Sequence, residues 1–229
     1  MNLHSIRGGS KQDLESNEYN IGVGISLGNK WFNVENIIDL VKWSLLYSKD
    51  KVVVYVADSI HALNIEARSG VSNEKAMRKA LEMGNTILEE VKNKIDNEFS
   101  ESDKLKIEYV HWDELKDEAY NSKLKFLYEY FENNLEFKNA ILDIVKDHLS
   151  KEVRTFEESE INLMAYYILE ELPECVSRVK IGTIAHDAFA YPTDGQLTDF
   201  VERIQNGETF PEVGKRILDT EPKVFLEVR

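Results

Sequence analysis

Apolar and polar residues follow one another along the chain in blocks that predict strands separated by helices. The segments "NIGVGIS" and "KVVVYVADS" are short apolar runs, which is typical of strands that are buried on both faces of a parallel sheet. Between them, "VENIIDLVKWSLLY" carries apolar residues at helical spacing. These three segments predict a strand, a helix and a second parallel strand, joined by a right-handed crossover.

The later segments continue this alternation. A long helix is expected from Ser72 to about Phe99, a strand over "KLKIEYVHW" and helical, mostly charged sequence from Asp113 to Leu149. The next helix, over "TFEESEINLMAYYILEELP", is expected to begin at the capping residue Thr155 and to stop at Pro173. "RVKIGTIAHDAFAYP" predicts another strand, "DGQLTDFVERIQNG" a helix that ends at Gly207, and "PKVFLEV" a last strand. The pattern therefore predicts an α/β fold with a Rossmann-like, mainly parallel sheet and helices on both faces.

The chain is expected to form one domain. Residues 1–19 contain the polar run "RGGSKQDLESNE" and are predicted to be a flexible leader. No repeat or low-complexity linker divides the sequence after it, so residues 20–229 are predicted to be a single Rossmann-like domain. With 42% hydrophobic residues, 229 residues are enough to bury one sizeable core.

Composition narrows the class of protein. The formal net charge of -14 argues against general nucleic-acid binding, because an acidic protein repels polyanions unless its cations are gathered on one face. Cys175 is the single cysteine and has no partner for an internal disulfide, and neither a signal sequence nor a long apolar stretch is found, so a cytoplasmic protein without a membrane contact is expected. The five histidines lack paired ligand spacing, so no metal site is predicted.

Ser26 stands in the turn that follows the first buried strand. The stretch from Gly24 to Gly28 fits G-x-S-x-G, the nucleophile elbow in which small neighbours let a serine stand on a sharp strand-to-helix turn. A serine hydrolase would then need a late histidine, for which His186 is the candidate. Gly22 and Gly24 also begin a dinucleotide fingerprint, although the third glycine falls one place late. A third interpretation is that the glycines only allow close packing, and all three stay open on this stretch alone.

A second candidate constellation is Tyr167 with Glu171. Their spacing of four residues places a phenol and a carboxylate on the same face of a helix. Such a pair can hold an ammonium group and take its proton as a general base. Tyr166 and Glu170 have the same spacing. A tyrosine–glutamate pair on an exposed helix face is often only solvent-exposed surface without a functional role.

Taken together, four segments resemble the cyclodipeptide synthase family, which joins two amino acids from aminoacyl-tRNAs into a diketopiperazine. They are "IGVGISLGNKWFNVENIIDLVKWS", "VVVYVADS", "YYILEELP" and "FAYPTDG". The segments stand in the order of the family and at similar separations, and the resemblance extends from about Ile21 to the end of the chain. The family's fold is similar to the catalytic domain of class I tyrosyl- and tryptophanyl-tRNA synthetases, which implies the same fold here.

The resemblance implies a covalent route through Ser26. This serine would receive the first aminoacyl group, and Tyr167 and Glu171 would hold the amino group of that residue. The proline at position 173 matches the family's Tyr-x-x-x-Glu-x-Pro helix and selects this pair rather than the one before it. The second aminoacyl-tRNA would then attack the acyl-serine, and the dipeptidyl ester would cyclise.

The resemblance to the family also implies roles for other positions of this chain. Gly24 and Asn29 would shape the pocket, and Tyr191 would position the ester or act with Ser26. One departure from the family is that Tyr191-Pro192 is typical of one subfamily and Asn29 of another. The substrate-binding positions implied by the resemblance are Gly22, Gly24, Tyr55, Trp112, Glu174, Phe189 and Pro192. Apolar residues are common in the family's first pocket, so the acidic Glu174 suggests a polar or histidyl first residue.

The resemblance also implies partners and excludes a cofactor. The helix after the second strand often contacts tRNA in the family, and its basic residues here are Lys75, Arg78, Lys79, Lys92 and Lys94. Because glutamates dilute them, weak and salt-sensitive tRNA binding is predicted. Two aminoacyl-tRNAs are the expected substrates of a monomer, and the synthetases' histidine-glycine and lysine-serine signatures for ATP are not found. A nucleotide-binding α/β domain without covalent chemistry and a serine hydrolase remain the alternatives.

Overall fold

The structure, a computed structural model, describes residues 1–181, 184–218 and 221–229. Its strands are β1 (Leu3–Arg7), β2 (Tyr19–Ile25), β3 (Ser48–Val56), β4 (Ile107–His111), β5 (Val179–Ile181), β6 (Ile184–His186), β7 (Ala188–Tyr191) and β8 (Val224–Val228). Its helices are α1 (Lys11–Glu15), α2 (Val34–Tyr47), α3 (His61–Ser69), α4 (Asn73–Glu98), α5 (Glu101–Lys104), α6 (Glu118–Asn133), α7 (Leu135–Leu149), α8 (Glu158–Val176), α9 (Gln196–Gln205) and α10 (Pro211–Ile217), and a 3-10 helix, η1 (Trp112–Leu115), follows β4.

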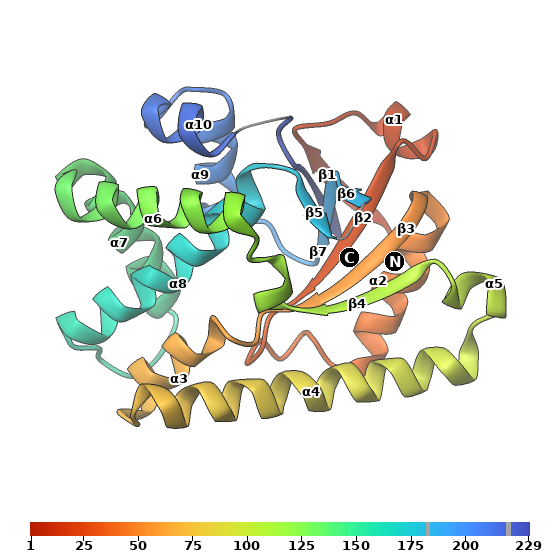
Figure 1. Ribbon diagram of the computed structural model, residues 1–229, viewed down its shortest axis with the longest axis horizontal. Helices are drawn as coiled ribbons and strands as arrows, with labels where there is room; N and C mark the ends of the chain where they lie inside the picture. The colour runs from red at the N-terminus through yellow and green to blue at the C-terminus, as the bar shows by residue number, and fades with distance from the viewer. Residues whose placement is uncertain (182–183, 219–220) are drawn as a thin grey trace.

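Six strands form the central sheet in the order β1-β8-β7-β2-β3-β4 (Figure 1). The four pairs from β8 to β4 are parallel, and β1 joins β8 antiparallel. Every residue of β2 is buried, as are the last five of β3, which explains their apolar sequence. The predicted α/β fold with a mainly parallel sheet is therefore confirmed.

The two faces of the sheet have different neighbours. Because successive side chains of a strand alternate, Ile21, Val23 and Ile25 of β2 share one face and pack with apolar residues of α2 and α4. Gly22 and Gly24 lie on the opposite face, in register with Val53 and Tyr55 of β3. That face packs toward α8. The space beside the two glycines is occupied by the larger side chains of Tyr55 and Phe189, from the neighbouring strands β3 and β7.

A separate helical layer carries α8. Helices α6 to α10 form a second apolar core of their own, in which α8 contacts α6, α7, α9 and α10 (Figure 1). The same helix contacts α3, whose position after β3 puts it at the carboxyl end of the sheet. α8 is thus held between two cores, which fixes the side chains it presents toward the ends of β2 and β7.

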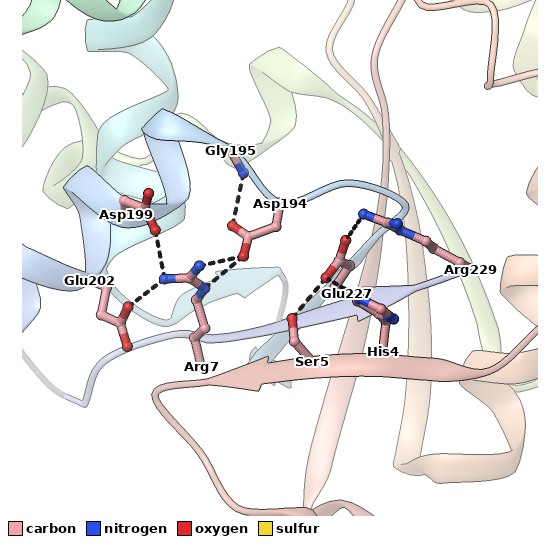
Figure 2. A network of polar contacts seen from close by, with 9 residues as sticks. All are labelled: His4, Ser5, Arg7, Asp194, Gly195, Asp199, Glu202, Glu227 and Arg229. Carbon is pink, nitrogen blue, oxygen red and sulfur yellow. Dashed lines mark hydrogen bonds and ion pairs between the residues drawn. The ribbon is translucent and has the colours of Figure 1, made fainter.

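The flexible leader predicted for residues 1–19 differs from the structure. β1 pairs with β8, and Leu14 of α1 is 1% exposed within the main core. Arg7 contacts Asp194, Asp199 and Glu202 around the loop that follows β7 (Figure 2). An edge strand needs only some apolar side chains because backbone pairing orders it, so a polar sequence conceals this element.

Other differences concern where elements begin and end. α8 begins at Glu158, after the capping residue Glu157, and continues through Pro173 to Val176 rather than stopping at the proline. The expected helical stretch from Asp113 to Leu149 is broken at Asn134, whose side chain caps the second part. The single strand expected over residues 178–192 is three short strands, and positions 182–183 of that stretch lie outside the described residues. Helices α3 and α10 have no counterpart in the sequence analysis.

Candidate active site

The turn after β2 presents Ser26 at the carboxyl end of the parallel strands. Gly28 has a φ of +82°, a left-handed conformation that favours glycine, and His61 packs against it from α3. The Asn29 side chain accepts a hydrogen bond from the backbone amide of Trp31 at 3.0 Å. The turn is therefore held by local geometry and ends where α2 begins, with Ser26 partly exposed.

Two tyrosine side chains far apart in the sequence meet at Ser26. Its hydroxyl forms hydrogen bonds with the phenol groups of Tyr167 on α8 and Tyr191 at the end of β7. Tyr167 also donates to Glu171, one turn further along α8, and Asn29 donates to Tyr191. The five residues predicted as catalytic from the sequence are thus brought into one hydrogen-bonded group.

The protonation behaviour of this group departs from that of free side chains. Burial raises the pKa of Glu171 from 4.5 to about 8, although the hydrogen bond from Tyr167 lowers it and the nearby Glu174 raises it. Burial also raises the pKa of Tyr191 to about 12 and that of Tyr167 well above its ordinary value. A carboxylate with a pKa near that of an amine can both bind an ammonium group and accept its proton.

The neighbouring pair on α8 has other partners. Tyr166 donates to Glu132 at 2.8 Å. Glu170 accepts from Tyr128 at 2.9 Å and lies 3.0 Å from the Lys116 ammonium nitrogen. This pair serves contacts between helices, whereas Tyr167 and Glu171 face Ser26.

An open groove of about 500 Å³ adjoins Ser26. One wall is the turn after β2, including Ser26 and Asn29, and the other is the middle of α4, including Lys79, Glu82 and Glu90. The Ser26 side chain is therefore reached from the surface of the protein through this groove.

The hydrolase interpretation lacks a suitable histidine. His186 is 1% exposed, and neither of its ring nitrogens has a hydrogen-bond partner among the described residues. Burial, together with the charge of Lys223, lowers its pKa to about 3. The groups that contact Ser26 are phenols, so the site lacks the serine–histidine pair that attack on an amide requires.

The family comparison decides between the remaining interpretations. The model of the cyclodipeptide synthase family matches residues 10–210. This chain belongs to the cyclodipeptide synthase family. A search of curated protein sequences finds no match.

Solved structures of cyclodipeptide synthases share its fold. The chain is similar to one from Bacillus thermoamylovorans, with 22% identity over 95% of this chain and 91% of that chain and a TM-score of 0.73. It is similar to one from Mycobacterium tuberculosis, with 20% identity over 85% and 83% and a TM-score of 0.66, a structure that demonstrates that these enzymes are related to type I tRNA synthetases. A third, from Candidatus Glomeribacter gigasporarum and bound to Phe-tRNAPhe, has 20% identity over 92% and 88% and a TM-score of 0.57.

The substrate-binding positions implied by this family gather next to the site. Tyr55 and Phe189 stack with ring centroids 5.8 Å apart, and Tyr55 also contacts Trp112. Both stacked rings contact Gly24, and Tyr55 also covers Gly22. Pro192 is buried directly after Tyr191. Glu174 is buried on α8, one turn after Glu171.

Sequence reasoning missed the partner of Glu174. Lys223, directly before β8, is 3% exposed and forms an ion pair with Glu174, which is 2% exposed. Lysine is rarely buried, and nothing local in the sequence marks this one. The signal that could have found it is indirect, because a buried carboxylate requires a charged or hydrogen-bonding partner.

The five basic residues of α4 do not form one surface. Lys75, Arg78 and Lys79 are exposed within the first two turns, and Lys79 lines the groove. Lys92 lies over the ring of Tyr109 at 5.0 Å, and Lys94 forms ion pairs with two glutamates. The first three share one stretch of the helix surface by their spacing, and of these Lys79 lines the groove at Ser26.

A metal-binding cluster and a membrane-spanning helix are both absent from the described residues. In that part of the chain, no group of three histidine, cysteine, aspartate or glutamate side chains could hold a metal ion. Within the same residues, none of the helices is both long and apolar enough to cross a membrane.

Proposed function

We propose that this cyclodipeptide synthase forms its product from two aminoacyl-tRNAs through an aminoacyl ester on Ser26. The observation that carries the proposal is the hydrogen-bonded group of Ser26, Tyr167 and Tyr191 beside a carboxyl group whose pKa is about 8. The open groove at the serine supports a macromolecular substrate. An aminoacyl ester is already activated, so the serine needs less help than against an amide and no ATP is required.

The first half-reaction transfers an acyl group between oxygens. The Ser26 oxygen attacks the ester carbonyl carbon of the first aminoacyl-tRNA and the bond to the ribose oxygen breaks. The serine proton passes to that leaving oxygen, and Tyr191, hydrogen bonded to Ser26 and Asn29, is positioned to relay it. Tyr167 and Glu171 hold the amino group of the transferred residue. The products are aminoacyl-Ser26 and free tRNA.

The second half-reaction makes two peptide bonds. The amine of the second aminoacyl-tRNA attacks the acyl-serine and releases Ser26 with its proton restored, which leaves a dipeptidyl-tRNA. The free amine of that dipeptide then attacks its own ester and releases the cyclic dipeptide and the second tRNA. Each attacking amine must first lose a proton, and Glu171 is the group in the site whose pKa suits that transfer.

The finer details complete the proposal. Gly24 shapes the pocket, and the enzyme works as a monomer in the cytoplasm, where charged tRNA is available. The sequence alone suggests a polar or histidyl first residue from Glu174, but the carboxylate is already paired with Lys223, so the product formed by the wild-type enzyme decides the identity of the first residue.

The test is mass spectrometry of culture medium from a bacterial host that expresses the chain. A new diketopiperazine is expected, and Tyr167→Phe is expected to lower its amount about 10-fold or more because a hydrogen bond to a charged group is lost. Tyr166→Phe is the matched control, since its phenol contacts Glu132 instead, and it should leave the product unchanged. Equal effects of the two substitutions would contradict the assignment, and absence of any new product from folded wild-type protein would contradict the function.

Weak, salt-sensitive tRNA binding is a separate prediction. The logarithm of the tRNA association constant falls with the logarithm of the salt concentration, and each phosphate contact contributes about 0.7 to 0.9 to the steepness of this fall. In the triple variant K75A/R78A/K79A the fall is expected to be less steep by about 2. The variant K92A/K94A is the control and should change the slope less, since Lys94 is already paired with Glu35 and Glu98. Binding of a charged tRNA, measured by filter retention at several salt concentrations, checks both. A wild-type slope near zero would rule out the electrostatic contact.

A further inference from the structure

A buried ion pair contacts Tyr55, one of the substrate-binding positions implied by the family. The Lys223 ammonium group contacts Oε1 of Glu174, and the same oxygen accepts a hydrogen bond from the Tyr55 hydroxyl at 2.8 Å. The three side chains come from the segment before β8, from α8 and from β3, and each is at most 3% exposed. Charges are buried in this way only when each is paired, so the trio holds together parts of the fold that are distant in sequence.

The same lysine contacts the aromatic rings that cover β2. Its Nζ lies 5.9 Å from the ring centroids of both Tyr55 and Phe189, within the range of cation–π attraction. Tyr55 is therefore fixed at both ends, by its hydroxyl on Glu174 and by its ring against the lysine and Phe189. Its orientation is set by the ion pair rather than by packing alone.

These two rings occupy the space beside the glycines of β2. A Cβ atom added to Gly24 would lie 2.5 Å from Phe189 Cε2 and 3.1 Å from Tyr55 Cε2. One added to Gly22 would lie 2.9 Å from Tyr55 Cε1. Distances this short leave no room even for a methyl group, so the rings rest directly on the backbone of the strand that leads to Ser26.

Phe189 keeps part of its surface exposed, whereas the side chains around Tyr55 are closely packed. Tyr55 is 3% exposed and Trp112 and Glu174 are each 2% exposed. A void large enough for a water molecule would appear as accessible surface on its lining. On the Tyr55 side of Phe189 these described residues therefore leave no room, and a bulky aminoacyl group that entered there would have to displace Tyr55 from the buried ion pair.

The inference that follows rests on the proposed function. We propose that Lys223 is a specificity-determining residue, which acts through Glu174 to hold Tyr55 and Phe189 over β2 and so restricts the first aminoacyl group to one with a small side chain, such as glycine, alanine or serine. Lys223 acts at a distance from the reacting atoms and selects by size. The charge of Glu174 is already matched inside the protein, so it does not select a basic or histidyl side chain.

The experiment offers the purified enzyme single charged tRNAs and identifies the aminoacyl group on the protein by intact mass. Wild-type protein is expected to accept small residues at least about 10-fold better than leucine, phenylalanine or histidine, a ratio of the size that one or two methylene groups can produce. Tyr55→Val removes the ring and its hydrogen bond and is expected to admit leucine. The double variant E174L/K223M replaces the ion pair by apolar side chains of similar volume, a change that buried pairs often tolerate, and is expected to broaden acceptance in the same direction.

The outcomes separate the two hypotheses. Preferential acylation of wild-type protein by leucine, phenylalanine or histidine would overturn the small-residue proposal and leave the covalent route intact. Unchanged selectivity in an active Tyr55→Val or E174L/K223M protein would overturn the role of Lys223. No acylation of wild-type protein by any charged tRNA would remove the covalent function, and this inference with it. If Tyr55→Val does not fold, the wild-type preference and the double variant still decide the matter.

Discussion

Ser26→Ala is expected to abolish both the cyclic dipeptide and any aminoacyl adduct, with a fall in rate of about 1,000-fold or more, the size seen when a nucleophile is removed. Without the serine oxygen the proposed acyl acceptor is gone, and the two tyrosines are poor substitutes because burial raises the pKa of their phenols and keeps them protonated. The fold should be unaffected because the Ser26 side chain is partly exposed and its interactions are with the phenols of Tyr167 and Tyr191 rather than with the apolar core. Intact-protein mass spectrometry after rapid mixing with one charged tRNA measures the adduct.

Ser44→Ala is the matched control for this experiment. Ser44 is fully buried on α2, and its hydroxyl has no hydrogen-bond partner among the described residues. Its removal should leave both adduct and product at wild-type levels. An adduct of equal yield on Ser26→Ala protein would place the acyl group on another residue and refute the route.

Glu171→Gln is expected to lower the rate about 100-fold or more, within the range for loss of a general base. Because burial raises the pKa of Glu171 to about 8, kcat/KM of the wild-type enzyme should rise with pH until about pH 8 and then level off. The variant should lose this dependence. Rates measured from pH 6 to pH 9 check both, and a wild-type profile that is flat through pH 8 would contradict the role of this carboxylate.

Glu171→Gln lowers the rate but should make the protein more stable than wild type at high pH. A carboxyl group with a folded-state pKa of about 8 and an ordinary value of 4.5 binds more protons in the folded protein between these pH values. Its contribution to stability is therefore fully present below about pH 4.5 and is lost as the pH rises toward 8. Glutamine does not titrate, so the variant should gain stability relative to wild type as the pH rises. Urea denaturation midpoints at pH 5 and pH 9 measure the difference, and no change in it would contradict the raised pKa.

The arrangement of the site could be predicted from local sequence signals. Buried apolar strands predict a parallel sheet, and Ser26 and Tyr191 follow such strands, so both were expected at the same edge. The four-residue spacing of Tyr167 and Glu171 predicts one helix face, and a packed helix can present that face to the edge of the sheet. Each signal depends on neighbours within a few residues, which is the range over which periodicity carries information.

Features that depend on distant partners could not be predicted in this way. Lys223 and Glu174 are 49 residues apart, and neither has a neighbour that marks it as buried. Backbone pairing with β8 orders strand β1 even though it has few apolar residues. From its sequence alone, such a polar segment cannot be distinguished from a flexible one. α8 continues past Pro173 because Leu172 and Val176 pack in the helical core, which offsets the hydrogen bond that proline cannot make.

The position of β7 in the sheet has a consequence for biosynthesis. The strand that carries Tyr191 lies between β2 and β8, and β8 is made some thirty residues later, at positions 224–228. Until the ribosome has released those residues, one edge of β7 has unpaired backbone groups that can recruit a strand from another chain. Lys223, just before β8, arrives equally late, so Glu174 is without its counter-ion in a nascent chain. Translation arrest before this point would therefore leave the strand that carries Tyr191 exposed to aggregation.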